Sequence, residues 1–185
     1  MSNSINVNAG KPSVSGAIFV APLGTGLPTD ATTAKNVAFV ELGYVSEDGV
    51  TNSNATNTAD IKAWGGDTVL SLINEKTDTW TFTLIESDNK NALKIAFGDA
   101  NVTEDGSGNI TVKANNKVQA NREFIIEMVG QDNLARRVVI PNAAVTAVGD
   151  IVYKADQAIG YPITLTANLD SNNNTHYEYI QASGT

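Results

Sequence analysis

The sequence contains no cysteine, so neither disulfide bonds nor thiolate chemistry can contribute to its stability or function. It has a single histidine, His176, which is too few for a zinc site, and no Gly-x-Ser-x-Gly motif offers a nucleophile for a hydrolytic triad. The phosphate-binding Gly-x-x-x-x-Gly-Lys-Ser/Thr motif is absent as well. We expect a protein that is not an enzyme, holds no cofactor or metal, and carries His176 as an ordinary surface or strand-end residue.

Long apolar runs are also missing. No run approaches the roughly 18 residues needed to span a bilayer. The N-terminal sequence has no basic start, and its apolar segment AIFV is too short for a secretory signal. We therefore expect no membrane anchor and synthesis in the cytoplasm.

Positively charged residues are scarce, because 12 Lys and Arg stand against 20 Asp and Glu and give a net charge of −8. A protein that grips nucleic acid normally presents a basic patch, since neutralising the phosphates supplies most of the affinity. Direct binding of nucleic acid is therefore disfavoured. An acidic surface can still lie close to DNA where DNA must not adhere to it.

One pair of carboxylates deserves comparison with an active site. Glu123 and Glu127 share one face of an expected strand, and two carboxylates can catalyse glycoside hydrolysis. A glycosidase cleft is usually lined with aromatic residues, however, and the chain has only two Trp. We expect the pair to be exposed or to face another subunit.

Residues that favour strands and turns dominate what is present. Val and Thr are typical of strands, and Asn and Gly are typical of the turns between them. The 185 residues therefore predict a single, mostly β domain over 1–185. Within it we expect a polar N-terminal segment at 1–15 and one helix at 87–97, capped by Ser87 and stopped by Gly98.

Two of the expected strands have one apolar face and one small, polar, uncharged face. In the first strand Trp80, Phe82 and Leu84 alternate with threonines, and in the second Ile163 and Leu165 do the same. The polar faces consist of Thr79, Thr81 and Thr83 in the first strand and of Thr164, Thr166 and Asn168 in the second.

A long polar segment, 45–66, separates two expected strands. It begins with a turn at 47–49, has almost nothing to bury, and ends at Trp64 and a pair of glycines. A loop of this length in a compact domain is usually disordered or functional. Trp64 is interpreted either as an anchor for a partner or as an ordinary core residue.

Four segments, in this order, resemble the major tail tube proteins of long, non-contractile-tailed (siphovirus-type) bacteriophages. They are ELGYVSEDGVT at 41–51, IKAWGGDTV at 61–69, RRVVIPNAAVT at 136–146 and GYPITLTANLD at 160–170. Each alone is a strand and turn that any β domain could contain, but their order is specific. Together they extend over most of the chain.

The resemblance implies a ring-forming tail tube fold, which is a β-sandwich or barrel with one flanking α-helix and a long protruding loop or arm. It implies a structural virion protein of the phage tail, made in the cytoplasm of the host bacterium. Such a protein polymerises as stacked hexameric rings with a continuous inner β-barrel, through which genomic DNA passes without specific binding. The implied protein partners are the tape measure, the terminator and the distal tail or baseplate proteins.

In this implied assembly, segment 45–66 is an arm that packs on a neighbouring subunit or ring. Its candidate contact residues are Asp48, Gly49, Trp64, Gly65 and Gly66. The two small polar strand faces are candidates for the wall of the lumen.

Four acidic residues are candidates for the lumen of the implied tube. Asp78 and Glu86 have the parity opposite to the threonines of their strand, so one strand cannot present both sets inward without a bulge. Glu123 and Glu127 are therefore the better candidates. Two other classes of protein stay open. One is another phage tail or secretion-tube ring protein, such as a terminator or a type VI-like tube, and the other is a β-sandwich adhesin or carbohydrate-binding module.

Overall fold

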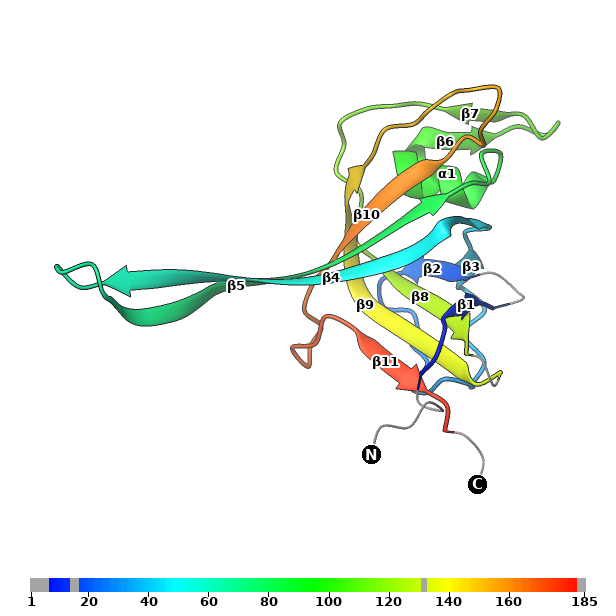
Figure 1. The fold of residues 1–185 in the computed structure, drawn as a ribbon. Helices are drawn as coiled ribbons and strands as arrows, with labels where there is room; N and C mark the ends of the chain where they lie inside the picture. The colour runs from blue at the N-terminus through cyan, green and yellow to red at the C-terminus, as the bar shows by residue number, and fades with distance from the viewer. Residues whose placement is uncertain (1–6, 14–16, 131–132, 183–185) are drawn as a thin grey trace.

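One antiparallel sheet contains most of the strands in this computed structural model, which describes residues 7–13, 17–130 and 133–182. The strands lie in the order β3-β2-β8-β9-β10-β5-β4, with β1 paired to β8 and β11 paired to β9. Their bounds are β1 Lys11–Pro12, β2 Ile18–Pro22, β3 Val40–Glu41, β4 Val45–Lys62, β5 Thr68–Leu84, β8 Arg122–Val129, β9 Ala135–Val148, β10 Tyr161–Ala167 and β11 Tyr177–Ile180. A separate hairpin consists of β6 Val102–Glu104 and β7 Ile110–Val112. The expected fold class, mostly β with one flanking helix and a protruding arm, is confirmed (Figure 1).

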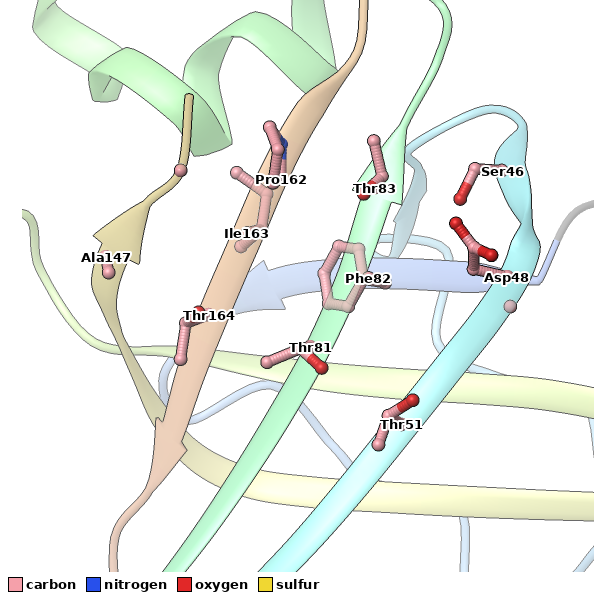
Figure 2. A pocket seen from close by; sticks show the side chains of 12 residues that line it. Ser46, Asp48, Thr51, Thr81, Phe82, Thr83, Ala147, Pro162, Ile163 and Thr164 are labelled. Carbon is pink, nitrogen blue, oxygen red and sulfur yellow. The ribbon is translucent and has the colours of Figure 1, made fainter. Parts of the chain in front are cut away.

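The long strand β9 joins two layers of this sheet. Residues 135–143 of β9 pair with β8, and residues 143–148 pair with β10. We call the first part of β9 with β8, β2 and β3 the back layer, and the last part of β9 with β10, β5 and β4 the front layer. In Figure 2 the ribbons of β2 and β8 cross behind those of β10 and β5. This is the arrangement of sandwiches in which a corner strand passes from one sheet to the other.

The main core lies between the two layers. The back layer contributes Phe124, Ile126 and Ile140 to it, and the front layer contributes Phe82 and Leu165. Burying a side chain of this size stabilises the fold by about 1.5–3 kcal/mol relative to leaving it exposed. Because successive side chains of a strand point to opposite faces, the threonines that alternate with these residues lie on the outside of the front layer.

A second, smaller core lies on the outer side of the back layer. Apolar side chains of β2, β8 and β9, among them Ile125, are covered there by the segment 23–39. Arg137 of β9 fixes this segment, because its guanidinium donates to the carbonyl oxygens of Asp30 and Thr33 at 2.9 and 2.8 Å. This face of the back layer is therefore closed to solvent.

Helix α1 (Lys90–Phe97) packs against the main core through an apolar stripe. It begins at residue 90 instead of the expected 87 because Asn89 caps it, accepting a hydrogen bond from the backbone N–H of Asn91 at 2.9 Å. Gly98 follows the last turn with φ 94°. The buried side chains of the stripe are Ala92, Leu93, Ile95 and Ala96. No helix in the described ranges is long and apolar enough to cross a membrane.

Strands β4 and β5 extend beyond both layers as a two-stranded ribbon, which Figure 1 shows leaving the body on one side. The expected loop 45–66 is therefore a strand followed by a tight turn, and 68–77, expected as a strand of the body, is the return strand of the ribbon. The reason is that only the end of β5 packs in the core, whereas residues 68–76 are exposed. We call residues 55–77 the arm.

The N-terminal segment expected at 1–15 is described only in part. Residues 1–6 and 14–15 lie outside the described residues, and Lys11–Pro12 form β1 beside the end of β8.

Candidate assembly surfaces

Small uncharged side chains cover the outer face of the front layer. Thr164 of β10 lies beside Thr81 of β5, and Thr81 lies beside Thr51 of β4. Figure 2 shows these three side chains across neighbouring strands, with Ala147 of β9 on the far side. The next row consists of Thr166, Thr79 and Ser53. The strand register thus brings the two small polar faces of the sequence together, and we call the combined surface the threonine face.

Hydroxyl groups of this face form hydrogen bonds with one another and with the backbone. The Thr146 Oγ1 lies 3.0 Å from the Thr166 Oγ1 and donates to the carbonyl oxygen of Thr164 at 3.3 Å. The rows defined above contain no charged side chain. Such a surface can be wetted by water but offers a polyanion no cation to bind.

The front layer has an open edge on each side. β4 is the last strand in the sheet order, so its outer backbone groups have no strand partner within the described ranges. On the other side β8 stops at the pair Arg122 and Ala143, so residues 144–148 of β9 pair with β10 alone. Unpaired edges of this kind are ready to pair with another chain.

The start of β4 carries a bulge where the sequence predicted a turn. Residues 46–49 leave the ladder between β4 and β5, and Gly49 has a φ of 69°, which favours glycine. Figure 2 shows Asp48 near the end of the threonine face, where Asp48 and Thr83 line a shallow hollow. The candidate arm residues Asp48 and Gly49 therefore lie outside the arm, beside the threonine face at the end of the front layer that is farthest from the arm.

Trp64, Gly65 and Gly66 lie in the turn at the tip of the arm. The turn is closed by a hydrogen bond from the N–H of Ala63 to the carbonyl oxygen of Asp67 at 2.8 Å. The relative exposure of Trp64 is 107%. The interpretation of Trp64 as a core residue is therefore wrong, while its role as an anchor stays a prediction.

The outer third of the arm presents apolar side chains that the sequence interpretation did not assign to it. Ile61 lies opposite Leu70, and Ala59 lies opposite Leu72, so the four side chains form a continuous apolar ladder on one face. Ile61, Leu70 and Leu72 are 48%, 49% and 46% exposed. They were missed because the return strand was expected to belong to the body, where its apolar residues would be buried.

Glu123 and Glu127 do not offer free carboxylates to a channel, which corrects the expectation for both. Glu123 is 4% exposed, and its Oε1 accepts a hydrogen bond from the N–H of Gly24 at 2.8 Å. Glu127 pairs with Arg137 at 2.6 Å and with Lys35 at 3.2 Å. The parity argument placed the two on one face correctly, but the segment 23–39 covers that face. Burial raises the pKa of the Glu123 carboxyl.

Asp78, the first of the other acidic candidates, is a buried hub at the root of the arm. Its carboxylate is reached at 2.6 Å by Asn52 Nδ2 of β4, by Thr175 Oγ1 and by His176 Nδ1. Burial alone would raise the pKa of the Asp78 carboxyl, but the hydrogen bonds from Thr175, His176 and Asn52 outweigh it and lower the pKa. The ring of His176 also meets the edge of Trp80, with centroids 5.2 Å apart. The hub holds β4, β5 and the segment before β11 together where the arm begins.

The carboxylate of Glu86, the remaining acidic candidate, accepts hydrogen bonds from its own chain. It accepts hydrogen bonds from the N–H of Tyr44 at 2.9 Å and from the side chain of Asn89 at 2.8 Å. Within the described residues no group of three or more His, Asp or Glu side chains could hold a metal ion.

A family model described as phage tail tube protein matches residues 4–184 of this chain. A search of curated proteins finds no match. Among solved structures, a chain of the anti-feeding prophage cap (AFP tube terminating cap) matches with a TM-score of 0.46 and 11% identity, over 97% of this chain and 99% of that chain. A chain of an extracellular contractile injection system, the PVC sheath-tube complex in the extended state, matches with a TM-score of 0.43 and 13% identity, over 93% of this chain and 92% of that chain.

Proposed function

The chain belongs to the phage tail tube protein family, and from this membership we propose that it closes into hexameric rings that stack into the tail tube of a siphovirus-type phage. It is a structural component of the virion tail that polymerises into the tube, and it is not an enzyme. The hexameric ring and the siphovirus-type tail rest on the resemblance of the four sequence segments described above.

The front layer, with its two open edges, is the observation that carries this proposal. Its four strands alternate in direction, because each neighbouring pair is antiparallel. An even number of alternating strands lets the alternation continue across a junction between copies related by rotation about the ring axis. The edge of β4 in one copy would then pair antiparallel with residues 144–148 of β9 in the next, and the ring would have no free edge.

In this arrangement the threonine face is the wall of the lumen. The opposite face of the front layer packs in the main core, so the threonine face is the side free to line a channel. Small hydroxyl side chains give DNA no cation to bind, and the net charge of −8 repels a polyanion. DNA would pass through without specific binding.

Acidic groups near this wall come from the bulge and not from β8. Glu47, Asp48 and Asp150 gather around a hollow next to Thr83 at one end of the threonine face. We assign to them the repulsive role that the sequence had suggested for Glu123 and Glu127. Contacts with the tape measure, the terminator and the distal tail or baseplate proteins complete the proposed set of partners.

Electron microscopy of the purified protein over a range of concentrations tests this proposal. We expect hollow tubes of uniform diameter, and more of them at higher salt, because screening reduces the repulsion between acidic subunits. Isolated monomers at every concentration and salt would contradict the proposal. Single rings that never stack would indicate a terminator.

A further inference from the structure

A loop without acidic residues lies beside the open edge of β9. Residues 113–121, between β7 and β8, contain Lys113 and Lys117 and no Asp or Glu, in a chain whose net charge is −8. The loop reaches β9 at its end, where Asn121 Nδ2 donates to Asn142 Oδ1 at 2.8 Å. Figure 1 shows the chain passing the end of β9 on its way from β7 to β8. We call residues 113–121 the basic loop.

Hydrogen bonds to the body hold the basic loop in place, while its charged and apolar side chains stay exposed. The N–H of Lys113 donates to the carbonyl oxygen of Asn101 at 2.8 Å, and Gln119 Nε2 donates to that of Ile95 at 3.0 Å. Both lysines are exposed, and neither forms an ion pair with a described residue. Val118, beside Lys117, is 98% exposed. A loop that is already held loses little conformational entropy when it docks.

The opposite charge lies beside the other open edge, at the start of β4. Glu41 and Glu47 are exposed, and neither pairs with a cation of the described residues. Tyr44, between them in the chain, is 74% exposed. The three residues line one hollow together with Ile126 of the main core, so they lie on the core side of β4. This edge therefore presents an exposed aromatic ring between two unpaired carboxylates.

Closure of a ring would bring these two places together. Val148 of β9 and Val50 of β4 stand in one row of the front layer, at its two edges, with Ile163 and Phe82 between them. The basic loop and the start of β4 thus flank opposite edges at the same end of the layer, the end away from the arm (Figure 1). A head-to-tail contact that closes into a ring joins such opposite edges. This step rests on the proposed function.

We propose that the basic loop of one copy docks beside the start of β4 of the next copy in the same ring, with Lys117 facing Glu41 and Val118 facing Tyr44. The opposed charges then select which edges meet. Two β4 edges repel each other because both carry Glu41 and Glu47, whereas a β4 edge attracts the β9 edge with its lysines. An open edge would otherwise pair with any other strand.

Cross-linking tests the contact directly, because the chain has no cysteine. The double variant Val118→Cys with Tyr44→Cys keeps all four charges and changes two exposed side chains. In assembled tubes treated with a short bis-maleimide cross-linker, it should give multimers on a denaturing gel that stop at the number of copies in one ring, which is six in the proposed tube. A contact between rings would give longer multimers and would overturn the placement within a ring.

The matched control is Val118→Cys with Val37→Cys. Val37 is also 98% exposed, but it lies in the segment 23–39 that covers the outer side of the back layer. This pair should stay monomeric on the gel, as should each single cysteine variant. Cross-linking of the control pair to the same extent as the Tyr44 pair would overturn the assignment.

Charge reversal tests the role of the ion pair. Lys117→Glu should raise the lowest protein concentration at which tubes form by about tenfold or more, because like charges then face each other at every junction. Glu41→Lys should do the same, and the two substitutions together should restore assembly. Urea denaturation of the unassembled variants should show unchanged folding, since both side chains are exposed. Failure of the double reversal to assemble better than either single variant would overturn the pairing.

The outcomes separate this contact from the proposed function. Tubes that are visible by electron microscopy but give no cross-link with the Tyr44 pair would overturn the docking of the basic loop and leave tube formation standing. Failure of the natural chain to form tubes would overturn the proposed function together with this inference.

Discussion

Single buried carboxylates set the local geometry of this protein. Asp78 accepts three hydrogen bonds at the root of the arm, from Asn52, Thr175 and His176. The Glu123 Oε1 accepts a hydrogen bond from the N–H of Gly24, whereas its Oε2 is buried with no hydrogen-bond partner among the described residues. A carboxylate therefore stabilises the fold at Asp78, where it is fully hydrogen-bonded, and destabilises it at Glu123, where one buried oxygen accepts no hydrogen bond from the described residues.

Replacing Asp78 with Asn should destabilise the folded chain, because three hydrogen bonds lose a charged acceptor. Hydrogen bonds to charged groups contribute about 1.5–3 kcal/mol each, and Asn keeps part of the acceptor, so we expect a loss of about 1–3 kcal/mol in the free energy of unfolding. Urea denaturation of the unassembled protein measures it. The control is Asp156→Asn, which changes an exposed loop carboxylate. Equal free energies of unfolding for the two variants would show that the hydrogen bonds of Asp78 do not stabilise the fold.

The same hub predicts a loss of stability in acid. The pKa of Asp78 is lower in the folded chain than its ordinary value of 3.8. Its contribution is therefore present above pH 3.8 and is lost as the pH falls through the folded value. The stability difference between the natural chain and Asp78→Asn should shrink on acidification below this value, as measured by urea denaturation at several pH values. A difference that is constant with pH would contradict the assignment.

Glu123 should show the opposite pH dependence. Burial raises its pKa above the ordinary value of 4.5 in the folded chain, so its favourable contribution is complete below 4.5 and is lost as the pH rises through the folded value. Glu123→Gln keeps an acceptor for Gly24 and carries no charge. The variant should therefore gain stability relative to the natural chain as the pH rises above 4.5. Parallel pH profiles from chemical denaturation would refute this.

At the scale of elements, the arm and the front layer differ in how far the sequence could predict them. The alternation of Trp80, Phe82 and Leu84 with threonines fixed both faces of β5 where the main core covers one of them. For the apolar residues of 68–73, no pattern in the sequence tells whether they pack in the core of their own chain or against another chain. Only the observed pairing of these residues with β4 assigns them to the arm.

The covering of Glu123 could not be predicted either. Strand parity gives the face on which a side chain lies, but it says nothing about which distant segment covers that face. Here the cover comes from residue 24, which is 99 positions away in the chain. A contact at this sequence separation leaves no local signal.

Trp64 at the tip tests the arm as an assembly element. Because its side chain is fully exposed, Trp64→Ala should change monomer stability by no more than about 0.5 kcal/mol, the usual range for surface substitutions. Tube formation should be strongly reduced, because buried aromatic side chains concentrate binding energy at interfaces. Sedimentation and urea denaturation measure the two effects, with Tyr153→Ala, an exposed aromatic on a body loop, as control. A stability loss of about 3–5 kcal/mol, typical of a core Trp, would contradict the assignment.

At the scale of the whole molecule, the protein combines an uncharged threonine face with an acidic overall charge. The sequence predicted the small polar faces and the net charge of −8, but not which strand edges stay open. The open edges follow from the early end of β8 and from the terminal place of β4 in the sheet. Both features come from long-range pairing and became visible only in the fold.

A single cation on the wall should change how the tube treats DNA. Thr81→Lys places a positive charge in the middle of the threonine face, repeated in every copy. Tubes of this variant should retain DNA at low salt and release it as salt rises, because the binding depends on releasing counterions from phosphate. Thr81→Gln, which is long but uncharged, is the control and should not retain DNA. Equal retention by both variants in a pull-down at two salt concentrations would contradict the placement of this face in the lumen.

The most direct measurement is a cryo-EM reconstruction of assembled tubes at a resolution that separates strands. We predict an inner barrel in which β4 of each copy pairs antiparallel with residues 144–148 of β9 in the next copy, while Thr81 and Thr164 point into the lumen. A tube whose threonine face points outward, or whose β4 edge stays unpaired within the ring, would contradict it.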